Sequence, residues 1–295
     1  MSASKDDIKD NFVQYLFNEV GSSGRGTVST YIRAIDVLCE ALRITTDITP
    51  FNHDVWAITS PKELLALQHY VVEQQKLYVT KGEGIFVNLR AVGQSYFKNR
   101  WCSAAIRQLA MYRATCVYER TLQNVFENTT TGDEVSTKAD GIRIKNAECF
   151  ISEAIQPSSK EGKDALAVAK RRINQSVFRQ WIMGLYGNAC CVTGLNVPEV
   201  LRASHIIPWA SDRHNRMNPS NGLCLSATYD AAFDRHLISF DDDYRMVLSS
   251  RIRDFCTREV CVTYFKNFEG VRINLPSRFL PDRKLLERHR DLLVS

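Results

Sequence analysis

The sequence predicts an α+β protein in which a helical N-terminal domain precedes a second, mixed domain. Apolar residues recur at helical spacing through residues 1–126. The stretch 127–164 is polar and without periodicity, which is typical of a linker and surface segment. From residue 165 to residue 295, a helical segment gives way to short apolar stretches separated by polar loops. A chain of 295 residues is long enough for two domains of ordinary size.

The helices of the N-terminal domain follow from apolar periodicity and capping signals. An apolar face within Phe12–Val20 predicts the first helix, and Thr27 is placed to cap a second. The run SPKE at Ser60–Glu63 is a strong helix start, because the serine side chain can accept from a free amide and proline suits the first turn. A last helix is expected from about Ser103 to Leu122.

Composition and termini point away from a membrane. The chain is 44% hydrophobic and 24% charged, as ordinary soluble globular proteins are. It has no apolar run of about 18 residues, the length that a membrane span needs. The N-terminus, MSASKDDIKDNF, lacks the apolar segment of a signal peptide. We therefore expect a cytoplasmic protein without a membrane partner.

Cysteine usage and charge constrain the partners only loosely. The nine cysteines are scattered singly apart from the adjacent Cys190 and Cys191, and no C-x-x-C pair occurs. In a cytoplasmic chain such cysteines are most often buried, reduced thiols. A net charge of +5, with a pI near 8.7, is compatible with a nucleic-acid partner but does not require one.

The segment Gly84–Tyr118 carries basic residues and no acidic one. One interpretation is a DNA-binding face, on which cations contact phosphates and an aromatic ring contacts a base. The other is a pair of helices whose aromatic residues form the core and whose cations are solvated. The basic residues are Arg90, Lys98, Arg100, Arg107 and Arg113, and the aromatic residues between them include Phe86, Tyr96, Phe97, Trp101 and Tyr112.

The most informative stretch is RASHIIPWASDRHNRMNPSNGLCLSATYDAAFD, from Arg202 to Asp234. We predict a strand over 201–207 that carries His205, a loop over 209–220, a short strand over 222–225 and a helix from residue 226. On that helix Asp230 and Asp234 lie one turn apart on the same face. Two carboxylates at this spacing can share one hard cation such as Mg²⁺.

This layout suits phosphodiester hydrolysis. The reaction needs a base that activates water, positive charge near the phosphate oxygens and stabilisation of the leaving oxygen. A neutral histidine such as His205 suits the first task, because its pKa lies near working pH. A divalent cation held by a few protein ligands suits the other two.

Several separated blocks also resemble the HNH endonucleases, in particular the subgroup found as the C-terminal domain of bacterial restriction-type endonucleases. The blocks are RINQSVFRQWIMGLYGNACCVTGLNVPEVLRASHIIPW and NPSNGLCLSATYDAAFD, and the resemblance covers roughly residues 171–293. It implies a C-terminal ββα-metal fold with His205 as general base and Asp230 as metal ligand. It implies that Asn221 braces the loop or the base, and that Asp234 is a second metal ligand.

The chain departs from the family pattern at several positions. Ser204 stands where many members have a metal-ligating residue before the base, and His236 stands where the subgroup often has glycine. The zinc-knuckle cysteines of the family are reduced here to Cys190 and Thr193 in CCVTG, so we expect no structural zinc. With no histidine among the candidate ligands, the site is expected to prefer Mg²⁺ or Mn²⁺.

Each candidate residue has a plainer interpretation. His205 could be a strand-end histidine satisfied by backbone groups, and Asn221 before a glycine could be a simple turn or combine bracing with a catalytic role. Asp230 and Asp234 could form a solvated helix face. Two further candidates, Arg202 and Arg235, could contact phosphate through their guanidinium groups or could be plain surface residues.

The resemblance implies a metal-dependent endonuclease that cuts double-stranded DNA in the restriction of foreign DNA. One HNH site cuts one strand, so a double-strand break needs a homodimer or two binding events. Two alternatives stay open. The replaced ligands favour a DNA-binding protein without catalysis, and the N-terminal domain could instead sense a ligand or partner that triggers the nuclease.

Overall fold

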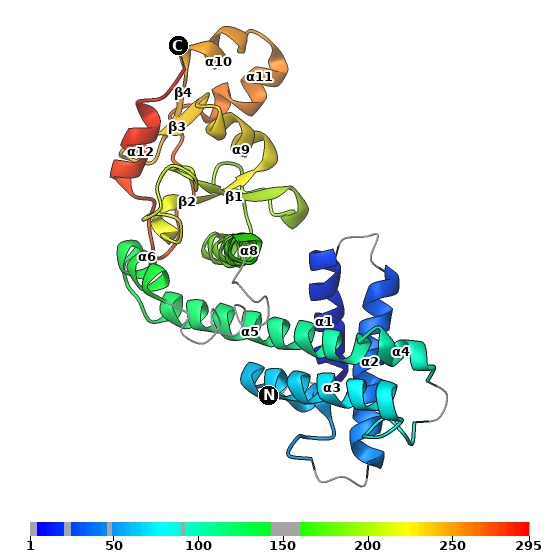
Figure 1. Ribbon diagram of the computed structural model, residues 1–295. Coiled ribbons are helices and arrows are strands. Elements are labelled where there is room, and N and C mark those ends of the chain that lie inside the picture. The colour runs from blue at the N-terminus through cyan, green and yellow to red at the C-terminus, as the bar shows by residue number, and fades with distance from the viewer. Residues whose placement is uncertain (1–4, 21–24, 46–48, 90–91, 143–159, 295) are drawn as a thin grey trace. The chain divides into compact units, whose positions relative to one another are not determined.

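The computed structural model describes residues 5–20, 25–45, 49–89, 92–142 and 160–294 (Figure 1). The chain forms two compact units. The first comprises Met1–Tyr118 with Ile144–Ala167, and the second comprises Glu119–Arg143 with Val168–Ser295. The division falls within helix α5 (Trp101–Glu127) and within helix α8 (Lys160–Leu185). The protein is of the mixed class that the sequence predicts, with a helical N-terminal region and small sheets in the C-terminal region.

The first unit is built from helices where the apolar periodicity predicts them. Ser60 caps α3 by accepting from the amide of Glu63 at 3.3 Å, as predicted. The prediction that Thr27 caps the second helix is wrong, because α2 already begins at Arg25. The helices of this unit are α1 (Lys5–Val20), α2 (Arg25–Ile44), a 3₁₀ turn (Val55–Ala57), α3 (Pro61–Lys81), α4 (Gln94–Lys98) and the greater part of α5.

The aromatic residues of the basic stretch lie in the core of this unit. Phe86 and Phe97 are fully buried against each other, with ring centroids 4.6 Å apart. The Tyr96 hydroxyl donates to the carbonyl of Thr30 at 3.0 Å, and Trp101 packs edge-on against Tyr31. These contacts favour the interpretation in which the rings form or cover the core, because Phe86 and Phe97 are buried and Tyr96, Trp101 and Tyr112 pack against it. A contact of this stretch with DNA stays a prediction.

The second unit contains the predicted strand–loop–strand–helix. Strands β1 (Leu201–His205) and β2 (Gly222–Ser226) pair antiparallel with His205 opposite Gly222, and α9 (Ala227–Asp234) packs against both strands. The other elements are α6 (Gly132–Gly141), most of α8, 3₁₀ turns at Pro198–Val200, Pro219–Asn221 and Lys266–Phe268, β3 (Ile238–Phe240), β4 (Met246–Leu248), α10 (Ser250–Phe255), α11 (Glu259–Tyr264) and α12 (Arg283–Arg290).

Helix α8 closes against β2 at a glycine. A Cβ added to Gly222 would lie 2.3 Å from Cδ1 of Ile182 and 2.9 Å from Cζ of Phe178. Such distances are far inside van der Waals contact, so only glycine lets the helix and strand approach this closely. The helix therefore places Phe178 directly beside the end of β1.

The polar stretch predicted as linker and surface segment contains a helix. The hydroxyl of Thr131 caps α6 by accepting from the amide of Glu134 at 3.3 Å, and Val135 and Ala139 are buried. Two buried apolar positions in ten residues give too weak a period for sequence analysis to detect. Residues 143–159 of that prediction lie outside the described residues, and residues 160–164 belong to helix α8 rather than to a linker.

The end of α9 places His236 in an unusual backbone conformation. His236 follows the helix with a φ of 52°, in the left-handed region that favours glycine. Its amide donates to the carbonyl of Phe233 at 2.8 Å, which closes the helix. Glycine would adopt this left-handed backbone with less strain than the histidine that this chain carries.

His289 on α12 is a buried neutral imidazole beside this helix end. Its Nε2 lies 3.1 Å from the carbonyl of Phe233, and its Nδ1 lies 2.9 Å from the hydroxyl of Ser239. Burial, followed by the neighbouring His236, lowers its pKa to about 4. The unfolded chain therefore binds a proton between pH 6.5 and 4 that the folded protein does not bind.

We expect the free energy of unfolding to fall by about 3 kcal/mol through His289 as the pH drops from 6.5 to 4, because one pKa unit corresponds to about 1.4 kcal/mol. Urea unfolding of wild type and His289→Met at pH 7 and pH 4 measures this, since the variant cannot titrate there. His69→Ala, which changes an exposed histidine, is the control. Equal pH slopes for wild type and His289→Met would contradict the prediction.

Within the described ranges, no helix has both the length and the apolar character needed to cross a bilayer.

Candidate active site

His205 ends β1 and is held on three sides. Its Nε2 lies 3.0 Å from the carbonyl oxygen of Arg216. Its ring stacks on Phe178, with centroids 3.9 Å apart and planes 11° apart, and meets the edge of Trp209 at 5.6 Å. Because a carbonyl can only accept, Nε2 carries the proton and Nδ1 carries the lone pair. Nδ1 has no hydrogen-bond partner among the described residues.

The protonation state of His205 suits a base. Burial lowers its pKa below the usual 6.5, and the hydrogen bond to the Arg216 carbonyl opposes this shift only in part. The imidazole is therefore neutral at pH 7. A fixed neutral imidazole with a free Nδ1 can take a proton from water.

Asn221 is fully buried and joins two parts of the loop. Its Oδ1 accepts from the amide of Ile207 at 2.8 Å, and its Nδ2 donates to the carbonyls of Ile207 at 3.1 Å and Asn215 at 3.0 Å. These contacts fix the chain just after His205 to the chain just before β2. They are the contacts of a bracing residue rather than of a simple turn.

The two carboxylates of α9 lie one turn apart on the same face of the helix. Asp230 is partly buried and accepts a hydrogen bond from the hydroxyl of Ser204, whereas Asp234 is exposed. The protein nevertheless removes part of the water around this carboxyl, and that desolvation, followed by the negative charge of Asp230, raises the pKa of Asp234, while Arg235 and His236 oppose the shift. Whether the two carboxylates share one cation stays a prediction.

The donor set fits a hard cation that keeps part of its water shell. In the described part of the chain, no three or more His, Cys, Asp or Glu side chains cluster in a way that could hold a metal ion. Two carboxylates and the buried hydroxyl of Ser204 offer only oxygen. Mg²⁺ is commonly bound by one or two carboxylates and retained water, so the chemistry of these donors suits it.

The structure holds the base and the carboxylates by separate contacts. Ser204 and His205 are successive residues of β1, and successive strand residues point to opposite faces. Ser204 reaches Asp230 on α9, whereas His205 stacks on Phe178 of α8. Among the described residues, no hydrogen bond or ion pair joins His205 to either carboxylate.

The candidate phosphate-contacting arginines are exposed. Nη1 of Arg202 donates to the carbonyls of Glu199 at 3.1 Å and Leu201 at 2.9 Å. Nη1 of Arg235 donates to the carbonyl of Ala231 at 3.2 Å. Each guanidinium has five N–H donors, so both keep donors for a phosphate.

The basic residues of the first unit differ in surroundings. Lys98 and Arg100 are exposed, and Arg107 is partly buried. Arg113 instead braces the core, because its Nη2 donates to the carbonyl of Trp56 at 2.8 Å and its Nε is buried. Arg90 lies outside the described residues.

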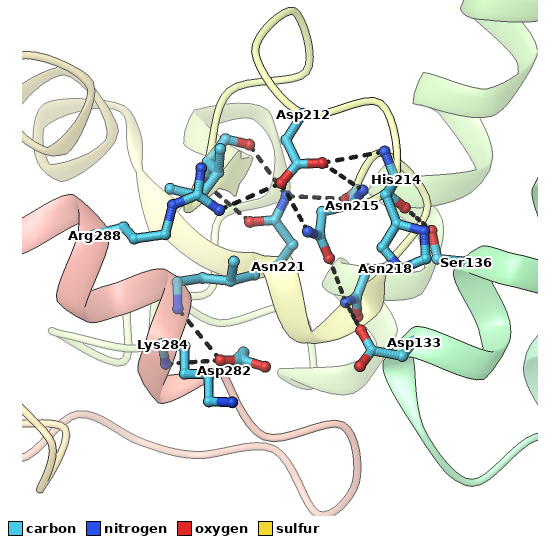
Figure 2. Close-up of polar contacts among 12 residues, drawn as sticks. Asp133, Ser136, Asp212, His214, Asn215, Asn218, Asn221, Asp282, Lys284 and Arg288 are labelled. Atoms are coloured by element: carbon cyan, nitrogen blue, oxygen red, sulfur yellow. Dashed lines mark hydrogen bonds and ion pairs between the residues drawn. The ribbon is translucent and has the colours of Figure 1, made fainter.

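Sequence reasoning missed the loop that holds the base. Asp212 accepts from the side chain of Asn215 at 2.9 Å, and the Oδ1 of Asn215 accepts from Asn218 at 2.8 Å (Figure 2). Arg216 contributes its backbone carbonyl, which no side-chain identity reveals. The spacing of aspartate and asparagine in DRHNRMNPSN was the available signal, because these side chains commonly bond to nearby backbone.

A strand-end histidine, an antiparallel partner strand and a following helix with acidic residues define a ββα domain. Residues 190–241 match the sequence profile of the HNH endonuclease family. The C-terminal region therefore carries an HNH endonuclease domain, as the sequence predicts. Such domains are nuclease domains that bind DNA and generally use a divalent metal. A search of curated proteins found no match to this chain.

Proposed function

We propose that the protein is a metal-dependent endonuclease that hydrolyses DNA phosphodiester bonds with His205 as general base. The observation that carries this proposal is the fixed, neutral imidazole of His205 within the matched domain. A surface histidine would not need stacking on one ring, contact with another and a buried brace behind it. In the plainer interpretation, backbone groups satisfy a strand-end histidine. That interpretation accounts for the hydrogen bond of Nε2 but gives no reason why Nδ1 has no partner among the described residues.

The proposed reaction assigns each group one task. Nδ1 of His205 accepts a proton from water while Nε2 stays on the Arg216 carbonyl, and the resulting hydroxide attacks phosphorus as the bond to the 3′ oxygen breaks. The leaving oxygen takes a proton from solvent. Asn221 keeps the loop and strand together during the reaction.

Asp230 and Asp234 would hold the divalent cation, and Ser204 would orient Asp230. When bound, the cation supplies positive charge to the phosphate oxygens and to the leaving oxygen. We favour Mg²⁺ or Mn²⁺ because the donors are oxygen atoms.

We propose double-stranded DNA as the substrate and restriction of foreign DNA in the cytoplasm as the setting. The helical first unit would contribute DNA contacts or regulation, and its exposed Lys98 and Arg100 support a contact with phosphates. A double-strand break would need two copies of the site.

A DNA-binding protein without catalysis is the second candidate. Two observations favour it: the carboxylates of α9 lack a third ligand of the usual kind among the described residues, and no polar contact links them to His205. This candidate retains the basic groups and needs no metal.

Cleavage of supercoiled plasmid with Mg²⁺, Mn²⁺, Ni²⁺, Zn²⁺ or EDTA distinguishes the two candidates. We expect metal-dependent nicking by wild type. Asp230→Asn should weaken the affinity for Mn²⁺, measured by calorimetry, about tenfold or more. Substitution of residues that merely support metal ligands commonly lowers affinity by this much, and here a charged ligand itself is lost. Asp243→Asn, which changes an exposed carboxylate of the same unit, should match wild type. Tight DNA binding without cutting under every condition would favour the second candidate.

A further inference from the structure

Helix α6, which precedes the matched residues 190–241, contacts the loop that holds the candidate base. Oδ1 of Asp133 accepts from Nδ2 of Asn218 at 3.0 Å, and the hydroxyl of Ser136 donates to the carbonyl of His214 (Figure 2). Asn218 and Ser136 are buried. These contacts connect two segments that lie far apart in the sequence.

The start of α6 fits the loop without spare room. A Cβ added to Gly132 would lie 2.0 Å from Oδ1 of Asn218 and 2.7 Å from Oγ of Ser220. The Asn218 side chain cannot move aside freely, because its Oδ1 also accepts from the amide of Ser220 at 2.9 Å. The absence of a side chain at Gly132 is therefore a requirement of this contact.

Asn218 connects α6 to His205 through hydrogen bonds within the loop. Its Nδ2 also donates to Oδ1 of Asn215, and its carbonyl accepts from the amide of Asn221 at 2.9 Å. Arg216 lies between Asn215 and Asn218 in the chain, and its carbonyl is the hydrogen-bond partner of His205. Fixing Asn218 thus fixes the group that sets the orientation of the imidazole.

The loop has a second anchor, but an exposed one. Arg288 of α12 pairs with Asp212 at 3.4 Å, and the arginine side chain is 56% exposed. Exposed ion pairs contribute little and are screened by salt. The contacts of α6 instead involve the buried side chains of Asn218 and Ser136, although Asp133 itself is exposed, and we take them as the stronger constraint on the loop.

We propose that Gly132 and Asp133 are positioning residues for His205, acting through Asn218 and the carbonyl of Arg216. The inference rests on the proposed function, because it concerns the base of that reaction. It extends the active site to a helix outside the matched domain. Neither residue touches the reacting atoms.

The glycines at the two ends of α6 provide a matched test in the full-length protein. Gly132→Ala places a methyl group against Asn218, whereas a Cβ at Gly141 meets nothing within 4 Å. We expect Gly132→Ala to lower kcat about 100-fold with KM changed less than about twofold, because misplacement of a catalytic group by about 1 Å has effects of this size. Gly141→Ala should match wild type.

A pair of substitutions at Asp133 keeps the proposal testable if Gly132→Ala fails to fold. Asp133→Ala removes the acceptor for Asn218 and should lower kcat. Asp133→Asn retains an Oδ1 acceptor and should restore kcat to near the wild-type value. Equal kcat for all Asp133 variants and wild type would overturn the role of Asp133.

Hydrogen exchange by mass spectrometry tests the link without relying on cleavage. The amides of Ile206 and Ile207 both donate to Asn221. We expect their exchange to speed up in Gly132→Ala and to stay unchanged in Gly141→Ala. Unchanged exchange in both variants would overturn the inference. If wild type cuts no DNA, the proposed function fails, and the exchange comparison still decides whether α6 sets the loop.

Discussion

Replacing His205 by alanine is expected to lower the rate of DNA cleavage about a thousandfold, within the range typical for loss of a general base. The substitution removes Nδ1, whose lone pair is free to accept a proton while Nε2 donates to the Arg216 carbonyl. It leaves both carboxylates of α9, and the contact of Asp230 with Ser204, in place. Binding of metal and DNA should therefore persist while the chemical step slows.

Single-turnover cleavage of plasmid over a range of pH measures this effect. Burial lowers the pKa of His205, so the wild-type rate should hold its plateau to below pH 6.5 and fall only as the imidazole becomes protonated. This acidic limb should be absent from the residual rate of His205→Ala. His69→Ala, an exposed histidine of the first unit, should retain the wild-type profile. Cleavage by His205→Ala within tenfold of wild type would place the base elsewhere.

Asn221→Ala is expected to reduce the free energy of unfolding by about 4 kcal/mol, because each buried polar group left without a partner costs about 1–3 kcal/mol. The groups left unpaired are the amide and carbonyl of Ile207 and the carbonyl of Asn215. Cleavage should fall strongly as well, since the loop would no longer be tied to the chain after His205.

Urea unfolding and plasmid cleavage, measured on the same preparations, test this expectation. Asn267→Ala changes an exposed asparagine of the same unit and serves as the control. If Asn221→Ala unfolds within 1 kcal/mol of wild type, the three hydrogen bonds of Asn221 do not carry the stability assigned to them.

The ββα domain was predictable because its signals are local and ordered. The signals are an apolar strand pattern that carries His205, a glycine after Asn221, and carboxylates four residues apart, and each matches the spacing of one element. The structure places these elements as predicted, with β1 shorter than expected and β2 one residue longer. Which ligands bind a metal stays a prediction.

Other features could not be predicted from residue identity. Arg113 and Arg100 are alike in sequence, yet one guanidinium braces the core and the other is exposed. Helix α6 is held by Thr131 and by contacts with a loop about 80 residues further along the chain. Tertiary contacts of this kind decide the structure of short polar segments, and the hydrophobic periodicity of the sequence does not reveal such contacts.

The position of α6 also affects how the protein can be divided for experiments. A fragment beginning at Ala165 would include every matched residue of the HNH domain and would lack Gly132, Asp133 and Ser136. Its loop would then lose the acceptor that Asp133 offers to Asn218 and the donor that Ser136 offers to the carbonyl of His214. A minimal catalytic fragment should therefore begin ahead of α6, and fusions that swap the recognition domain should keep this helix with the nuclease.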